Sequence, residues 1–379
     1  MAEINDDNGI KVIAFYLPQF HTIPENNLWW GEGFTEWTNV KKAKPLFDGH
    51  YQPKVPLNKN YYNLLDDDTM KNQIQLAKKY GVWGFCYYHY WFKDGKKLLE
   101  KPVEKMLKDK TVDLPFCLSW ANENWTKNWD GGNREIIMEQ DYGTEKEWIK
   151  HYEYLKPFFE DERYIKIDGH PLFIIYKPEL INELNEMLEC WNELAKKDGI
   201  NEIYYAFQFP SWFFHKEYDP KLFKYMIKFE PTFSGIAMNK KSLFHIIYFK
   251  FRQLLYNAFK IDISVKKKEI CKNPQLQIID YDYVWDKIIH GYSEKRMLSG
   301  AFTAWDNTAR NKNGKVFFES TPEKFGSYMK QLVKKVKKKK KDKIIFINAW
   351  NEWAEGAYLE PDEKYEYQYL EKIKEAIEL

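Results

Sequence analysis

Arginine is scarce in this chain of 379 residues: there are only five among a total of 58 lysines and arginines. The 58 basic residues are matched by 56 acidic ones, so the formal net charge at pH 7 is +2. A nucleic-acid-binding surface needs a strong local excess of positive charge. We therefore expect no nucleic-acid partner, and the shortage of arginine disfavours a site that grips a diphosphate.

Cysteine is scarce as well, and no two cysteines have the CxxC spacing of a metal site or a redox pair. We expect buried free thiols, typical of a reducing compartment, for the four cysteines Cys86, Cys117, Cys190 and Cys271. No histidine pair has the HxH or HxxxH spacing of metal ligands. The sequence thus predicts no metal and no cofactor, and a site built on His21 and His89 is the less favoured alternative.

Long apolar runs are missing too. No window holds about 18 uninterrupted apolar residues, the length needed to cross a bilayer, and residues 1–9 are polar rather than a signal region. We therefore expect a soluble, cytoplasmic protein with no transmembrane segment. Residues 242–260 are aromatic and basic at helical spacing, which leaves peripheral membrane association open. Nothing in the sequence indicates the oligomeric state.

Aromatic residues, by contrast, are abundant. They make up 18% of the chain and include 15 Trp, 27 Tyr and 26 Phe. Core packing rarely needs so much tryptophan, so we interpret part of it as a surface that faces carbohydrate. A compositional bias toward Lys, Asn, Ile, Tyr and Phe would explain the tyrosines and phenylalanines but not the tryptophans.

Short apolar runs alternate with longer segments of helical periodicity. Near-continuous apolar runs are typical of parallel strands that are covered on both faces. We expect eight such strands, at 11–17, 82–90, 114–120, 171–176, 202–208, 226–229, 299–304 and 344–349. Helices are expected at 67–80, 145–160, 179–198, 322–341 and 363–378. The alternation predicts an α/β fold, a (β/α)₈ TIM barrel, whereas an open doubly wound sheet is the alternative.

Two segments interrupt this alternation. Residues 26–57 form a long loop after the first strand, rich in Trp, Gly and Pro, and loops of that length are usually functional. Residues 236–292 form an insertion after the sixth strand, and we expect it to be helical and packed on the barrel. No linker divides the chain, so residues 1–379 are expected to form a single catalytic domain.

Polar and aromatic residues gather where the expected strands end, which is where TIM barrels place their active sites. From these ends and the loop after the first strand we select as substrate-binding candidates Tyr16, His21, Trp29, Glu36, Trp37, Tyr88, His89, Trp91, Trp120, Asn122, Glu123, Asn124, Trp125, Tyr176, Glu230, Trp305, Asp306 and Asn351. The same ends also hold Gln19, Tyr90 and Arg310, which are not among the candidates.

The eighth strand leads into two carboxylates three residues apart, Glu352 and Glu355, which are flanked by Trp350 and Trp353. Cleaving or forming a bond between sugars needs one group to protonate the leaving oxygen and another to act on the ring. An apolar wall raises the pKa of one carboxyl so that it keeps its proton. We therefore predict Glu352 and Glu355 as catalytic residues and expect the two indoles to form a sugar-facing wall.

Several of these candidates have simpler structural explanations. Taken singly, His21 and His89 are more often hydrogen-bonded structural histidines, Glu123 could cap a helix, and Glu230 could pair with a lysine. Trp120 and Trp125 could plug the barrel. The run of three aspartates at 66–68 matches a loose signature of metal-using sugar transferases, but it more simply begins a helix.

Five segments in order resemble the WbsX-like family. They are FYLPQFH at 15–21, GFTEW at 33–37, GFCYYHYW at 84–91, SWANENW at 119–125 and NEWAEG at 351–356. Members of that family have been labelled glycosyltransferases because they occur with polysaccharide biosynthesis genes. The family is also similar to glycoside hydrolase family 99, the endo-α-mannosidases, which are (β/α)₈ barrels.

The resemblance implies roles for the last segment. In family 99 the first glutamate of a Glu-Trp-His-Glu sequence deprotonates the sugar's own 2-hydroxyl, and the second is the general acid. By position these roles fall on Glu352 and Glu355, with Ala354 in place of the histidine. The expected activity is retaining hydrolysis of an α-linked mannose-type glycan or bacterial polysaccharide. A glycosyltransferase of cell-surface polysaccharide synthesis and a non-catalytic carbohydrate-binding barrel are the alternatives.

Overall fold

The computed structural model describes residues 2–4, 9–127, 135–209, 222–236, 275–339 and 341–379. Eight parallel strands form a closed ring, in which each strand pairs with the next one along the chain and the last pairs with the first. They are β1 (Lys11–Tyr16), β2 (Gly84–Trp91), β4 (Phe116–Trp120), β8 (His170–Ile175), β9 (Tyr204–Phe209), β10 (Phe223–Lys228), β12 (Met297–Phe302) and β14 (Ile344–Asn348). The predicted (β/α)₈ barrel is confirmed, and the open sheet is not formed.

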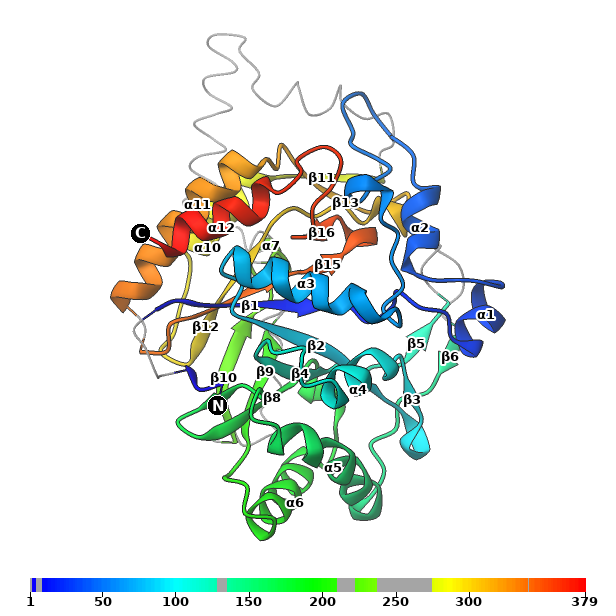
Figure 1. The fold of residues 1–379 in the computed structure, drawn as a ribbon, viewed down its shortest axis with the longest axis vertical. Coiled ribbons are helices and arrows are strands. Elements are labelled where there is room, and N and C mark those ends of the chain that lie inside the picture. Colours follow the sequence, from blue (N-terminus) through cyan, green and yellow to red (C-terminus); the bar gives the residue numbers. More distant parts are fainter. Residues whose placement is uncertain (1, 5–8, 128–134, 210–221, 237–274, 340) are drawn as a thin grey trace.

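The strands form where the apolar runs predicted them. Every residue of β1, β4, β12 and β14 is buried, because one side of each strand fills the barrel and the other packs on helices. Helices surround the ring, with α5 beside α6 and with α10, α11 and α12 grouped on another side (Figure 1). Among the described residues, no helix combines the length and the apolar character needed to cross a membrane.

The five expected helices are present, two of them with later starts, and further helices lie outside the expected helix ranges. Those that follow strands are α3 (Asp67–Lys79), α4 (Lys101–Lys108), α5 (Glu145–Glu160), α6 (Leu184–Lys197), α7 (Thr232–Ile236), α10 (Tyr281–His290), α11 (Pro322–Lys339) and α12 (Gln368–Ile377). α6 begins at Leu184 because a separate 3₁₀ turn, Pro178–Leu180, precedes it. α12 begins late because the Asp362 side chain accepts the backbone N–H groups of Lys364 and Tyr365, which closes a turn there.

The long loop after β1 contains two short helices that the sequence did not predict, α1 (Pro24–Trp30) and α2 (Glu36–Lys42). Each has seven residues, too few for a helical periodicity to stand out. A capping box between Thr35 and Thr38 begins α2. Of the predicted insertion, residues 237–274 lie outside the described part, and the remainder includes β11 (Gln277–Asp280), which pairs with β13 (Lys315–Phe318) beside the barrel.

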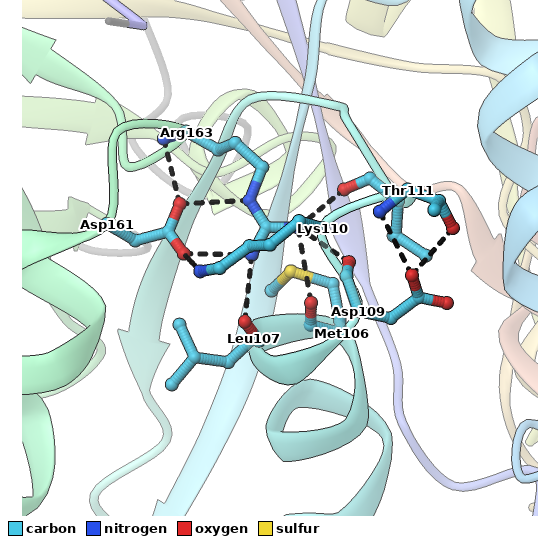
Figure 2. Close-up of polar contacts among 8 residues, drawn as sticks. Met106, Leu107, Asp109, Lys110, Thr111, Asp161 and Arg163 are labelled. Carbon is cyan, nitrogen blue, oxygen red and sulfur yellow. Dashed lines mark hydrogen bonds and ion pairs between the residues drawn. The ribbon is translucent and has the colours of Figure 1, made fainter.

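One of the five arginines ties α4 to the barrel wall. Arg163 is buried and donates hydrogen bonds to both carboxylate oxygens of Asp161, at 2.9 and 2.8 Å (Figure 2). Its guanidinium also reaches four backbone carbonyls at and beyond the end of α4, those of Met106, Leu107, Asp109 and Val112. A helix leaves its last carbonyls without partners, so this single side chain satisfies groups that would otherwise be buried unbonded.

We expect Arg163→Met to lower the free energy of unfolding by about 3–5 kcal/mol, because it leaves the buried Asp161 carboxylate with only the exposed Lys110 as a cation and takes the donor from four backbone carbonyls. Urea denaturation measures the change. Lys78→Met is the matched control, since the Lys78–Asp113 pair is exposed and should contribute less than about 1 kcal/mol. Equal effects of the two substitutions would contradict the assigned role.

The Arg163–Asp161 pair also makes the stability of the fold depend on pH. Burial alone would raise the pKa of Asp161, but hydrogen bonds from Arg163 and Lys110 lower it below its usual range. A carboxyl with a lowered folded-state pKa stabilises the fold above its unfolded pKa, and the stabilisation is lost as pH falls toward the folded value. The stability gap between the wild type and Arg163→Met should therefore persist from pH 7 to about pH 4 and close only at more acidic pH.

Candidate active site

A cavity of about 450 Å³ opens at the carboxyl ends of the barrel strands. Residues in or just after seven of the eight strands line it, and the segment that follows β9 lies outside the described residues. The lining is Leu17, Gln19, Tyr88, Tyr90, Ala121, Glu123, Asn124, Trp125, Thr126, Tyr176, Phe229, Thr232, Trp305, Arg310, Glu352 and Glu355. Both predicted catalytic glutamates are therefore in this cavity.

Arg310 connects these glutamates to a third. Its Nη1 donates to Glu355 Oε1 at 2.5 Å, and its Nη2 donates to Glu36 Oε1 at 2.6 Å and to Glu352 Oε2 at 3.3 Å. The side chains of Arg310 and Glu355 are 15% and 21% exposed, whereas those of Glu352 and Glu36 are 8% and 0% exposed. Charge-assisted bonds of this kind fix the orientation of the carboxylates toward the cavity.

The chain reverses sharply to place the two catalytic candidates together. After β14, the short strand Asn351–Glu352 pairs with Ala357–Tyr358, and a 3₁₀ turn lies between them. Gly356 ends the turn at φ +61°, and a Cβ there would come within 3.0 Å of Asp306. The Asn351 side chain bonds both the N–H and the carbonyl of Leu17, at 2.7 and 3.0 Å, which ties this turn to the end of β1.

Asp306 lies behind Arg310 rather than in the cavity lining. One of its carboxylate oxygens caps the 3₁₀ turn that leads to Arg310, accepting bonds from the amide and hydroxyl of Thr308. The other oxygen lies 2.8 Å from both His50 Nε2 and Gln52 Nε2. Its backbone N–H also donates to the Glu355 carbonyl at 2.6 Å. Asp306 therefore positions both the guanidinium and its carboxylate partner.

The tryptophans beside the catalytic candidates do not face the cavity. Trp350 and Trp353 are 0% and 1% exposed, and their indole N–H groups donate to opposite oxygens of Glu360, at 3.1 and 2.6 Å. Gln73 and Tyr62 donate to the same carboxylate. The expectation that these indoles form a sugar-facing wall is wrong, because a buried acceptor eight residues beyond Glu352 draws both of them into the protein.

Burial and the neighbouring like charges raise the pKa values of the two candidate glutamates. Burial raises the pKa of Glu352 well above its ordinary value, and the nearby Glu355 and Glu36 raise it further, against the opposing effect of Arg310. Burial also raises the pKa of Glu355, with Arg310 opposing and Glu36 adding to the rise. Three carboxylates around one guanidinium thus favour a proton on the pair near neutral pH.

Aromatic side chains form much of the remaining wall. Tyr88, Tyr90, Trp125, Tyr176 and Trp305 contribute rings, which suit the flat apolar face of a sugar. Burial raises the pKa of each of these three tyrosines above its ordinary value, so their hydroxyls are neutral and can donate hydrogen bonds. At the rim, Glu123 forms an ion pair with Lys177.

The predicted site residues fall into three groups. Eight line the cavity: Tyr88, Glu123, Asn124, Trp125, Tyr176, Trp305, Glu352 and Glu355. Five contact the lining or its supports from behind: Trp29, Glu36, Asn122, Asp306 and Asn351. Seven have contacts elsewhere in the protein and are absent from the lining: Tyr16, His21, Trp37, His89, Trp91, Trp120 and Glu230.

Strand geometry explains the separation along β2. Successive residues of a strand point to opposite faces, so Tyr88 and Tyr90 enter the cavity while their neighbours turn outward. His89 lies 2.8 Å from His151 of α5 through the Nε2 atoms, and Trp91 stacks on that imidazole with ring centroids 4.4 Å apart. Burial lowers the pKa of His89 to about 3, which keeps it neutral.

Several lining residues were absent from the selected candidates. Gln19, Tyr90 and Arg310 lie at predicted strand ends but were not chosen, and Phe229 ends the predicted sixth strand. Arg310 carried a usable signal, since arginine is rare in this lysine-rich chain. Within the described ranges, no three His, Cys, Asp or Glu side chains form a group suited to a metal ion.

We expect Glu360→Gln to lower the free energy of unfolding by about 1–3 kcal/mol. The carboxylate accepts hydrogen bonds at both oxygens, from donors that include Gln73 and Trp353, and the N–H₂ group of a glutamine cannot accept one in place of either oxygen. Near-UV circular dichroism should also change as the two indoles lose their shared acceptor. Glu363→Gln, on the exposed neighbouring turn, is the control and should leave both measurements unchanged. An unaltered spectrum for Glu360→Gln would refute the anchoring role.

Comparison with solved structures finds the same fold. A glycoside hydrolase-like protein aligns with 98% of this chain and 94% of its own, at a TM-score of 0.52 and 15% identity. The glycoside hydrolase family 99 endo-α-mannosidase from Bacteroides thetaiotaomicron aligns with 98% of this chain and 97% of its own, at a TM-score of 0.53 and 13% identity. At these identities the likeness concerns the fold alone.

Sequence comparison identifies closer relatives. A protein named WxcX from Xanthomonas campestris pv. campestris is 31% identical in strain B100 and 33% identical in strain ATCC 33913, over 380 and 376 residues. Both alignments cover 97% of this chain but 49% of the relative, so the chain spans about half their length. A family model described as Glycosyltransferase WbsX matches residues 12–373. The chain therefore belongs to the WbsX family.

Proposed function

We propose that this protein is a retaining glycoside hydrolase that cleaves an α-linked, mannose-type glycan or bacterial polysaccharide. The observation that carries the proposal is the pair Glu352 and Glu355, held by one guanidinium in an aromatic cavity at the mouth of the barrel. Glycoside cleavage needs two carboxyl groups of different protonation beside the scissile bond. The family 99 fold supports the same chemistry.

The two glutamates are assigned different roles. Glu355 has the more exposed side chain, so in the complex with substrate it takes up the single proton of the pair from Glu352 and passes it to the leaving oxygen as the bond to the anomeric carbon breaks. Glu352 takes the proton of the sugar's 2-hydroxyl, whose oxygen closes on the anomeric carbon to give an epoxide. Water then opens the epoxide, giving its proton to Glu355 while Glu352 returns its proton to the 2-oxygen. Two inversions at one carbon give net retention.

Replacing each glutamate separates these roles. Glu355→Gln should lower kcat on a glycan by about 10²–10⁴-fold, because the leaving oxygen then departs without a proton. An activated aryl glycoside should hide most of this loss, since its leaving group needs no proton. Glu352→Gln should lower kcat on both substrates. Near-normal turnover by both variants would end the proposal, and Glu363→Gln serves as the exposed control.

The substrate is found by screening α-mannans and bacterial O-polysaccharides for newly released reducing ends. Proton NMR of the first product formed should show the anomeric configuration of the substrate, as retention requires. Inversion would reject the 2-hydroxyl route while leaving hydrolysis intact. Absence of reducing ends on every glycan, with sugar-nucleotide consumption instead, would replace hydrolysis by transfer.

Transfer is the second candidate, because the family model carries the name of a glycosyltransferase. The charge of the cavity weighs against a sugar-nucleotide donor. Arg310 is the only cation among the described lining residues, and three carboxylates already bind it, so a diphosphate would meet no other positive group among those residues. A lipid-linked donor avoids this objection, and the same assay with such a donor tests it.

A further inference from the structure

Glu36 was expected to bind substrate, but its side chain is fully buried and absent from the cavity lining. It is the first residue of α2, where the positive end of a helix favours a carboxylate. Its backbone N–H donates to the carbonyl of Gln19, which lines the cavity. The long loop after β1 thus places a carboxylate against Arg310, behind the cavity lining, and this carboxylate does not contact the cavity itself.

The contacts of Glu36 are one-sided. Oε1 accepts the 2.6 Å bond from Arg310, whereas Oε2 is buried and has no hydrogen-bond partner among the described residues. A buried carboxylate oxygen without a partner is costly. A glutamine or asparagine at position 36 could also accept a hydrogen bond from the guanidinium, and its burial would cost less free energy than that of a carboxylate. The negative charge of Glu36 is therefore the feature that needs an explanation.

Charge balance gives the explanation. If Glu36, Glu352 and Glu355 were all ionised, one guanidinium would face three buried negative charges, a net excess of two. Low-dielectric surroundings make such an excess unfavourable, and a proton relieves it. Arg310 bonds Glu355 at 2.5 Å and Glu36 at 2.6 Å but Glu352 only at 3.3 Å, so the most weakly paired carboxylate, and with it the proton, belongs to the pair that faces the cavity.

We propose that Glu36 is a positioning residue whose fixed negative charge, acting through Arg310, keeps one proton on the Glu352–Glu355 pair. This inference rests on the proposed function for the use of that proton in acid catalysis. The effect of Glu36 on the protonation of the pair does not itself depend on any substrate. An enzyme that must hold a carboxylic acid at neutral pH gains from a third carboxylate that never contacts the glycan.

Other groups that face the pair do not supply this charge. Within the described part of the chain, the titratable and charged side chains around Glu352 and Glu355 are Glu36, Tyr88, Tyr90, Glu123, Tyr176 and Arg310. The three tyrosines stay neutral because burial raises the pKa of each. Glu123 lies at the rim, is 40% exposed and is paired with Lys177.

The first experiment is a pH–rate profile of Glu36→Gln on the substrate found by screening. The alkaline limb of kcat/KM reports loss of the proton from the pair. Removing the negative charge should move this limb to lower pH by about one unit or more. Glu36→Asp, which keeps the charge, should keep the limb near its wild-type position. Glu32→Gln, four residues away and exposed, is the control and should match the wild type.

Arg310→Gln should shift the alkaline limb of the pH–rate profile in the opposite direction to Glu36→Gln. Losing the positive charge should move the alkaline limb to higher pH, because the pair then holds its proton more tightly. A purely structural role for Glu36 and Arg310 would lower the rate at every pH and leave the limb in place. Opposed shifts support the proposal, whereas an unmoved limb in Glu36→Gln overturns it.

A second measurement needs no turnover. Carbon-13 NMR of protein labelled at the glutamate carboxyl carbons follows the titration of Glu352 and Glu355, whose signals are assigned by their absence in Glu352→Gln and Glu355→Gln. One of them should titrate in the wild type well above the ordinary midpoint of about 4.3, and Glu36→Gln should lower that midpoint. If Glu36→Gln does not fold, Glu36→Ala takes its place in the same titration, and an unchanged midpoint in that variant overturns the proposal.

Failure of the proposed hydrolase activity and failure of the proposed role of Glu36 give different results. A protein that releases no reducing ends but shows the raised midpoint and its fall in Glu36→Gln refutes the proposed hydrolysis and keeps the role of Glu36. A working hydrolase with an ordinary midpoint, or with one that Glu36→Gln leaves unchanged, keeps the function and refutes the role of Glu36.

Discussion

The geometry of the site depends on one guanidinium that binds three carboxylates, and these four side chains come from three separate parts of the chain. Arg310 follows β12, Glu36 begins α2 in the loop after β1, and Glu352 and Glu355 follow β14. These strands are neighbours in the closed barrel, because β14 pairs with both β1 and β12. Closure of the barrel is therefore what brings the four side chains together, and the guanidinium converts that proximity into a fixed arrangement.

A second set of buried polar groups holds this arrangement from behind. Asp306 fixes the turn before Arg310 and bonds the backbone of Glu355, while His50 and Gln52 fix Asp306. Glu360 anchors both indoles that flank Glu352. Each of these carboxylates accepts several donors, so a buried negative charge is stabilised at the positions that orient the site.

The sequence predicted the eight strands and the placement of Glu352 and Glu355 at the mouth of the barrel, because both leave a local signal: near-continuous apolar runs, and two glutamates directly after one of them. It did not separate the aromatic rings that face the cavity from those that are buried elsewhere. Trp120, Trp350 and Trp353 are almost wholly buried, so the tryptophan content overstated the sugar-facing surface. Which side of a strand faces inward, and whether an acceptor such as Glu360 lies behind a ring, depend on register and on distant residues that no local pattern records.

Arginine use links the composition to the site. Lysine supplies nearly all the positive charge of this chain, yet two of the few arginines occupy positions where many acceptors converge. Arg163 bonds one carboxylate and four carbonyls, and Arg310 bonds three carboxylates. A lysine ammonium is a point charge and cannot serve several planar acceptors at fixed angles, whereas a guanidinium can. In a chain that otherwise prefers lysine, an isolated arginine at a strand end therefore indicates convergence of buried acceptors, and at Arg310 the acceptors include both glutamates that we propose as the acid and the base.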